Sequence, residues 1–173
     1  MATSLERSFT GRMKGAALLD VHTYEEVEAD LDATSQAAGV VAIVAVAQAI
    51  GSLGMGGSGI VMAVLSAIFG WLIWSGLTYL IGDKLLGGTA TWGELLRTIG
   101  FAQSPGVLHV LGVLPLVGGL IRLVVGVWVL VAGIIAIRQA LDFSTGKAVL
   151  TAVVGWLVIM IPMAILAGLF GPS

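Results

Sequence analysis

The sequence predicts an all-α membrane protein, a polytopic helical bundle with five transmembrane helices. Of the 173 residues, 58% are hydrophobic and only 10% are charged, and the mean hydropathy is +1.06. A soluble domain carries about 25% charged residues. From Ala37 to Phe170 the chain is apolar apart from short polar interruptions, without the alternating pattern of a β-barrel. Because lipid cannot satisfy backbone polar groups, such segments must be helical.

Five apolar segments define the expected spans. They are Ala37–Leu53, Ile60–Ile81, Phe101–Leu116, Leu120–Ile137 and Ala148–Phe170. The second segment, rising 1.5 Å per residue, is long enough to cross the roughly 30 Å hydrocarbon core. The first is near the lower length limit, so whether it crosses completely stays open. Gln48 is the only strongly polar side chain in this first segment.

A charged stretch from Thr78 to Pro105 interrupts the apolar pattern. Charges are costly at the bilayer centre, so we expect this stretch at the membrane surface. Thr91 and Glu94 have the spacing of a capping box, which starts a helix. One face of that helix holds Trp92, Leu95, Leu96 and Ile99. We therefore expect a short interfacial helix with Trp92 at headgroup depth. A plain connecting loop is the alternative.

Residues 1–36 are expected to form a cytoplasmic N-terminal segment ahead of a five-helix domain at 37–170. The segment is basic at first and acidic afterwards. Thr23 and Glu26 match a second capping box, and Tyr24 and Val27 share a helical face. These features predict a short acidic helix over residues 23–33. Its acidic side is either a solvated face or a docking surface for a partner.

The distribution of basic residues predicts the orientation. With five spans, residues 1–36, 82–100 and 138–147 lie on the same side, and they hold all the Lys and Arg residues except Arg122. The positive-inside rule then places the N-terminus in the cytoplasm and the C-terminus outside.

Small residues recur at helical spacing on two of the spans. One seam repeats every seven positions, and the other repeats every four. The first consists of Gly119, Gly126, Gly133 and Ala140, and the second of Gly59, Ala63 and Ala67. Small side chains let another helix approach closely. We expect this packing inside the bundle, with an interface to another molecule as the alternative.

Residues with catalytic or metal-binding potential are scarce. The chain has no Cys and two His residues. His109 and Arg122 are the possible polar residues inside the membrane; we expect an interior hydrogen-bonded histidine and an arginine that extends to the headgroups. Gly54 to Gly59 matches G-x-G-x-x-G, but no strand precedes it, so a glycine-rich turn is expected. We therefore expect no catalytic residue, no cofactor and no metal site.

Two stretches resemble the Yip1 family. They are TYLIGDKLLGGTATWGELLRTIGFAQSPGVLHVLGVLP at 78–115 and ALDFSTGKAVLTAVVGW at 140–156. The resemblance implies five spans, a cytoplasmic N-terminus and no catalytic residues. Eukaryotic members bind prenylated Rab GTPases and carry a longer tail with an aromatic, acidic motif. That motif is missing here, which favours a prokaryotic plasma (inner) membrane and not a small-GTPase partner.

These observations predict a non-enzymatic protein that organises membranes, or acts as a scaffold, through helix–helix contacts. Its expected partners are the lipid bilayer and other membrane proteins or a second copy of itself, and not nucleic acid. A small accessory subunit of a larger membrane complex is one alternative. A minor transporter or channel built around His109 and Arg122 is another.

Overall fold

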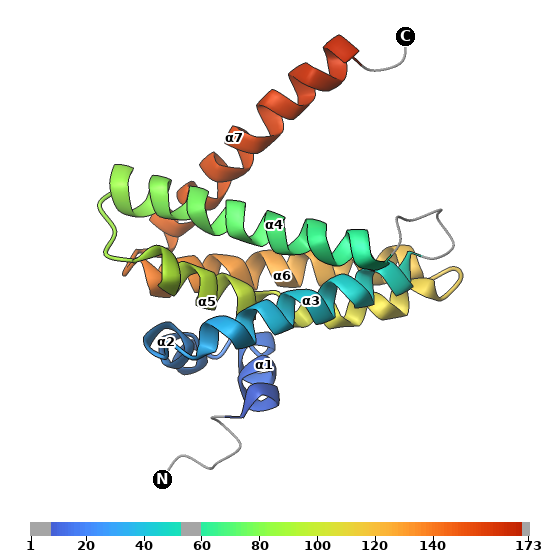
Figure 1. Cartoon of the computed structure of the whole chain (residues 1–173), viewed down its shortest axis with the longest axis horizontal. Helices are drawn as coiled ribbons and strands as arrows, with labels where there is room; N and C mark the ends of the chain where they lie inside the picture. The colour runs from blue at the N-terminus through green and yellow to red at the C-terminus, as the bar shows by residue number, and fades with distance from the viewer. Residues whose placement is uncertain (1–7, 53–59, 171–173) are drawn as a thin grey trace.

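The computed structural model describes residues 8–52 and 60–170, and this part is helical and contains no strand. The elements in chain order are α1 (Phe9–Ala17), α2 (Val21–Ala29), α3 (Ala33–Gly51), α4 (Ile60–Tyr79), the π-helix η2 (Leu80–Leu85), α5 (Trp92–Ala102), the 3₁₀-helix η3 (Ser104–Val113), α6 (Gly118–Ala140) and α7 (Thr145–Phe170). Figure 1 shows α3, α4 and α6 along the long axis of the molecule, while α7 leaves this bundle at an angle.

Four of the five expected spans are α-helices, with ends that differ by a few residues from the predicted ones. Among the described residues, three helices are long and apolar enough to cross a membrane: Ala33–Gly51, Gly118–Ala140 and Thr145–Pro162. The all-helical class is therefore confirmed, with three candidate spans.

The expected third span, Phe101–Leu116, is wrong as a continuous α-helix. α5 ends at Ala102, and the chain continues as the 3₁₀-helix η3. Pro105 has no N–H to offer the Phe101 carbonyl four residues earlier. The Ser104 hydroxyl donates to that carbonyl instead, at 2.6 Å. Because the Ser104 hydroxyl replaces the missing N–H of Pro105, the expected helix is interrupted at Gln103, between α5 and η3.

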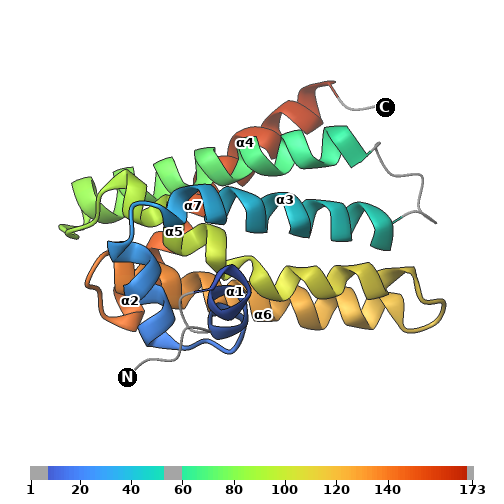
Figure 2. The ribbon, with the colours of Figure 1, turned by 60° about the horizontal axis from the view of Figure 1, so that its bottom comes forward.

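α5 is a core helix and not the interfacial helix that we expected. Its capping box is confirmed: Glu94 N donates to Thr91 Oγ1 at 3.3 Å, and Thr91 N donates to a Glu94 carboxylate oxygen at 2.8 Å. Trp92 is 47% exposed, but the rest of the apolar face, Leu95, Leu96 and Ile99, is buried inside the protein. α2, α3, α4 and α6 all contact α5, and Figure 2 shows it among them.

The N-terminal helices belong to the same core. Ala16, Tyr24 and Val27 are fully buried and pack in one cluster with residues of α3, α5 and α6. The Trp128 indole N–H of α6 donates to the Ala17 carbonyl at the end of α1, at 2.8 Å. The expected boundary between residues 36 and 37 therefore does not divide the structure.

The short acidic helix expected over 23–33 is present as α2, but it ends at Ala29 and its predicted cap is wrong. Asp20 is the N-cap and accepts from His22 N at 3.2 Å. Thr23 lies inside the helix and donates to the second Asp20 oxygen at 3.0 Å. Glu26 pairs with Arg12 of α1. Asp20 starts the helix earlier than Thr23, because its own carboxylate accepts from the N–H of His22, the second residue of the helix.

The glycine seam on α6 does not pack inside the bundle, contrary to the prediction. A Cβ atom added at Gly119, Gly126 or Gly133 would meet no described atom within 4 Å. Only Ala140, at the other end of the seam, is buried. On α4, Ala67 packs against the core, whereas Gly59 and the side chain of Ala63 lie outside the described residues.

The close helix approach occurs at Gly100 of α5. A Cβ there would lie 2.7 Å from the Ala37 Cβ and 3.2 Å from the Trp71 indole nitrogen. Both distances are shorter than packed side chains allow, so Gly100 lets α3 and α4 contact α5 directly.

We expect Gly100→Ala to lower the free energy of unfolding relative to Gly126→Ala by about 1–3 kcal/mol, the usual range for overpacking. Both changes give the same gain in helix propensity, so the comparison isolates the contact. The measurement is denaturation of the detergent-purified protein. Equal stability of the two variants would contradict the close approach.

Candidate functional site

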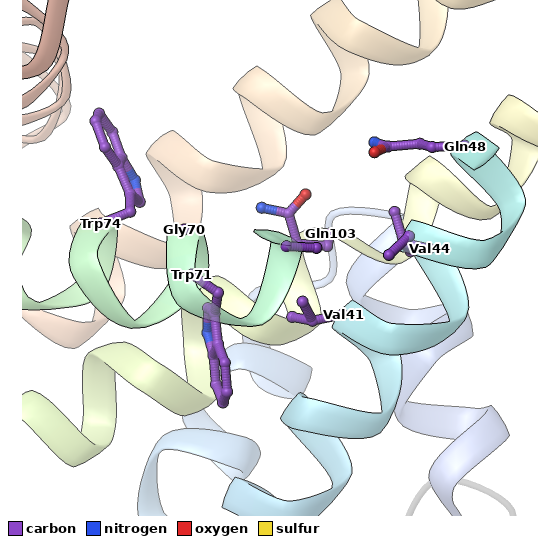
Figure 3. Close-up of a pocket in the computed structure, with 9 residues that line it drawn as sticks. Val41, Val44, Gln48, Gly70, Trp71, Trp74 and Gln103 are labelled. Atoms are coloured by element: carbon purple, nitrogen blue, oxygen red, sulfur yellow. The ribbon is translucent and has the colours of Figure 1, made fainter. Parts of the chain in front are cut away.

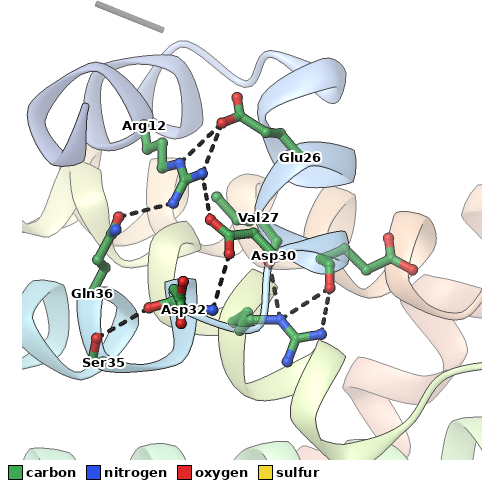
Figure 4. Close-up of polar contacts among 9 residues, drawn as sticks. Arg12, Glu26, Val27, Asp30, Asp32, Ser35 and Gln36 are labelled. Atoms are coloured by element: carbon green, nitrogen blue, oxygen red, sulfur yellow. Dashed lines mark hydrogen bonds and ion pairs between the residues drawn. The ribbon is translucent and has the colours of Figure 1, made fainter. Parts of the chain in front are cut away.

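Arg12 connects the first three helices through its buried guanidinium group (Figure 4). Its Nη2 lies 2.9 Å from a Glu26 carboxylate oxygen and 2.6 Å from an Asp30 carboxylate oxygen. Its Nη1 donates to the side-chain oxygen of Gln36 on α3 at 3.1 Å. The Arg12 hydrogen bond lowers the pKa of Asp30. This cluster of Arg12, Glu26, Asp30 and Gln36, here called the N-terminal polar network, holds α1, α2 and α3 together.

Arg97 caps α2 from the middle of the chain. Its side chain is buried, and its Nε donates to the carbonyl oxygens of Val27 and Glu28, each at 3.0 Å. Its Nη2 donates to the Glu28 carbonyl as well. The last carbonyls of a helix lack partners within the helix, and that end favours a cation. Arg97 therefore belongs to the core, and not to the water boundary where the sequence placed it.

The charges of carboxylates on two other elements act on Glu28, whose carbonyl takes part in this contact. Burial raises the pKa of Glu28 on α2 to about 7, with further contributions from the charges of Glu94 on α5 and of Asp142 after α6. Asp142 accepts a hydrogen bond from the Thr89 hydroxyl at 2.7 Å. The end of the bundle that holds α2 and the start of α5 is therefore acidic.

His109 and Arg122 lie toward the other end of the bundle. The His109 Nδ1 is 2.9 Å from the Gly106 carbonyl oxygen within η3. Arg122 Nε donates to the Gly118 carbonyl at 3.2 Å. Arg122 also lines a cavity of about 290 Å³ beside Gly112 and Leu116. Each of the two side chains hydrogen-bonds to a carbonyl of its own helix, and a role in transport stays a prediction.

A cavity of about 240 Å³ opens between α3, α4 and the break at Gln103 (Figure 3). We call it the amide cavity, because Gln48 and Gln103 supply its polar side chains. Its other lining residues include Val41, Val44, Trp71 and Trp74. The sequence drew attention to Gln48 but not to Gln103, which keeps helical backbone angles at the end of α5 and lines the cavity from there.

The two tryptophans of α4 have different positions. The Trp71 indole N–H donates to the Leu96 carbonyl of α5 at 3.0 Å and fixes one wall of the amide cavity. Trp74 also lines a second hollow of about 380 Å³ where α7 leaves the bundle. This α7 groove is lined by Trp74, Leu130, Ile134, Val149, Val153 and Trp156, among others, and its side chains are apolar.

A model of the Yip1 domain matches residues 24–166. The chain belongs to the Yip1 domain family. Neither a curated protein nor a solved structure shows significant similarity to it. The Yip1 domain starts inside α2 and ends inside α7, so it contains the Arg97 cap, the amide cavity and the α7 groove. Together with the three apolar helices, it makes the chain an integral membrane protein.

Metal-ligating side chains do not gather in the described part of this Yip1 domain. Within residues 8–52 and 60–170, no three His, Asp or Glu residues lie close enough together to hold a metal ion. The glycine-rich segment from Gly54 to Gly59 lies outside the described residues, so the nucleotide-like pattern there is untested.

We expect Arg97→Leu to lower the free energy of unfolding by about 1–3 kcal/mol, because it leaves buried carbonyls without a donor. The free energy of unfolding of Arg97→Lys should lie between those of Arg97→Leu and the unmodified chain, because an ammonium group lacks the planar fork of a guanidinium group. Arg138→Leu is the control, because that side chain donates to its neighbour Gln139 and is only partly buried. Thermal denaturation in detergent measures all three. Equal midpoints for Arg97→Leu and Arg138→Leu would exclude the capping role.

The Glu28 carboxyl predicts a pH dependence. Its pKa is about 7 in the folded chain and 4.5 as the ordinary value, so the folded chain holds the proton more tightly. The stabilisation that comes from the protonated Glu28 carboxyl is therefore complete below pH 4.5 and is lost as the pH rises through 7. We expect Glu28→Gln to melt above the unmodified chain at pH 8 and to match it near pH 4.5.

The control for this experiment is the exposed Asp32, replaced by Asn. It should show no such divergence between the two pH values. A Glu28→Gln curve parallel to that of the unmodified chain across the range would contradict the prediction.

Proposed function

We propose that this Yip1 domain protein works without catalysis, as a membrane scaffold that holds a helix of another membrane protein against α6 and α7. The observation that carries the proposal is the uncovered glycine seam on α6. A Cβ atom at Gly119, Gly126 or Gly133 would meet no described atom within 4 Å. Small residues at this regular spacing suit close contact with another helix.

The seam changes from covered to open along α6. Residues seven apart lie on nearly the same side of a helix, so the three glycines and Ala140 form one stripe. Ile137 and Ala140 at one end are buried. Further along, Gly133 lines a cavity with residues of α4, α5 and α7, and Gly126 and Gly119 are exposed. A thin face of this kind allows a second backbone to approach, and no described residue covers it at Gly119 and Gly126.

α7 adds an apolar surface beside the seam. It leaves the bundle in Figure 1, and Trp156, Leu157 and Ile161 on it are exposed. The α7 groove of about 380 Å³ lies between α7, α4 and α6. Its apolar lining suits the side chains of a transmembrane helix. We infer that such a helix lies along α6 and inserts side chains into this groove.

The membrane arrangement that fits this role has five crossings, made by α3, α4, the α5–η3 pair, α6 and α7. The first four run in alternating directions along the long axis in Figure 1, and α7 leaves them at an angle. With 11 residues in α5 and 10 in η3, the pair rises by about 36 Å, which exceeds the bilayer core. The basic residues favour a cytoplasmic N-terminus, and a prokaryotic inner membrane is the proposed location.

An accessory subunit would use the same surface, so it differs from a free scaffold only in having one permanent partner. A minor transporter has a weaker basis, namely the Arg122 cavity of about 290 Å³ at one end of α6. Identification of the protein held at the seam separates these readings.

Because the chain has no Cys, a single introduced thiol reports on one position only. We expect Gly126→Cys and Gly133→Cys, each carrying a maleimide–benzophenone label, to give a discrete cross-linked product in native membranes. Val124→Cys is the matched control, because it is also exposed on α6 but points about 160° away. A product of twice the chain mass would identify a second copy as the partner. Equal cross-linking at Val124, or none at the glycines, would refute the proposal.

A further inference from the structure

We propose that the amide cavity binds the uncharged glycerol and ester end of a neutral lipid, with diacylglycerol as the type. This site lies between α3 and α4, whereas the proposed scaffold contact lies on α6 and α7, and Trp74 lines both the amide cavity and the α7 groove. Gln48 and Gly70 line the amide cavity and not the α7 groove, so variants at these two positions can fail separately from the scaffold proposal.

The cavity has an opening toward the surroundings. Gln48 of α3 and Gly70 of α4 are exposed, and both line it. A Cβ added at Gly70 would meet no described atom within 4 Å, so nothing closes the cavity at that point. Inside, Trp71 is 7% exposed and Val41 is 4% exposed. The site is therefore an apolar hollow that a membrane molecule can enter from the side.

Its two amides have no hydrogen-bond partner among the residues that the structure describes. Figure 3 shows the side chains of Gln48 and Gln103 extending toward the space between α3 and α4. Among the described hydrogen bonds, none involves either amide group. Each amide offers two N–H donors and one carbonyl acceptor. Gln48 is exposed and Gln103 is half-buried. In apolar surroundings an unpaired amide is unfavourable, so a hydrogen-bonding ligand stabilises this arrangement.

The lining selects the chemistry of the ligand. No charged side chain is among the lining residues, so a phosphate or an ammonium group finds no counter-charge there. Hydroxyl and ester groups donate and accept, and two facing amides satisfy both needs. A helix is about 10 Å wide and cannot enter a cavity of about 240 Å³. A glycerol end with the first part of an acyl chain can enter, and the rest of the chain then lies along the outer surface of α4.

The site lies beside two of the proposed membrane crossings, where a lipid can reach it. Gln103 stands at the α5–η3 break, beside α3 and α4, two of the proposed crossings. Diacylglycerol has a free hydroxyl and two esters, and no charge. It therefore matches the two amides and the apolar walls better than a phospholipid headgroup does.

The test uses the full chain in phosphatidylcholine nanodiscs and a diacylglycerol that carries a diazirine near its glycerol end. We expect saturable labelling of α3 and α4, located by mass spectrometry and displaced by unlabelled dioleoylglycerol. Gln48→Leu and Gln103→Leu should each reduce labelling at least tenfold. Gln139→Leu is the control, because that amide donates to Glu25 outside the cavity, and labelling should stay within twofold.

Gly70→Leu provides a second, independent variant. It leaves both amides in place and meets no described atom at its Cβ, so it should fold normally while filling the opening. We expect it to block labelling as well. A phosphatidylcholine probe with the same diazirine should not label the cavity. Equal labelling by that probe, or labelling unchanged by Gly70→Leu and both glutamine variants, would show ordinary boundary lipid and overturn the proposal.

Discussion

The hydrogen bonds from Arg97 to the end of α2 determine how the rest of this structure is arranged. Arg97 is buried, and the carbonyls of Val27 and Glu28 are its partners across about 70 positions of sequence. Once α2 covers this side of α5, the helix cannot lie on a membrane surface. α5 becomes the central element, and α3, α4 and α6 pack around it.

A single local feature of α5 then produces the amide cavity. Pro105 cannot continue the helix, and the Ser104 hydroxyl satisfies the carbonyl that would be left open. The chain turns into η3 at this point, and Gln103, which ends α5, lines the cavity beside α3 and α4. Trp71 bonds to the Leu96 carbonyl on the same helix, so one wall is fixed by the same element that supplies the polar group.

Glycines have two opposite uses in this bundle. At Gly100 the absence of a side chain is required, because Ala37 and Trp71 occupy the space. At Gly126 the absence of a side chain leaves a thin face with no described atom on it, and at Gly133 it leaves space in a cavity beside α4, α5 and α7. The first use stabilises the chain itself, whereas the second suits contact with a helix from outside. Gly70 is a third case, because it keeps the mouth of the amide cavity open.

The sequence by itself determined the helical membrane class, most helix positions, and the capping box of Thr91 and Glu94, because composition, periodicity and capping act over a few neighbouring residues. It also pointed to the family, since those stretches are local too. Only the tertiary structure decided that Leu95 and Arg97 are buried, that Gln103 meets Gln48 across a cavity, and that the α6 seam is open. Periodicity tells which residues share a face of a helix, but the neighbour of that face depends on elements far away in the chain.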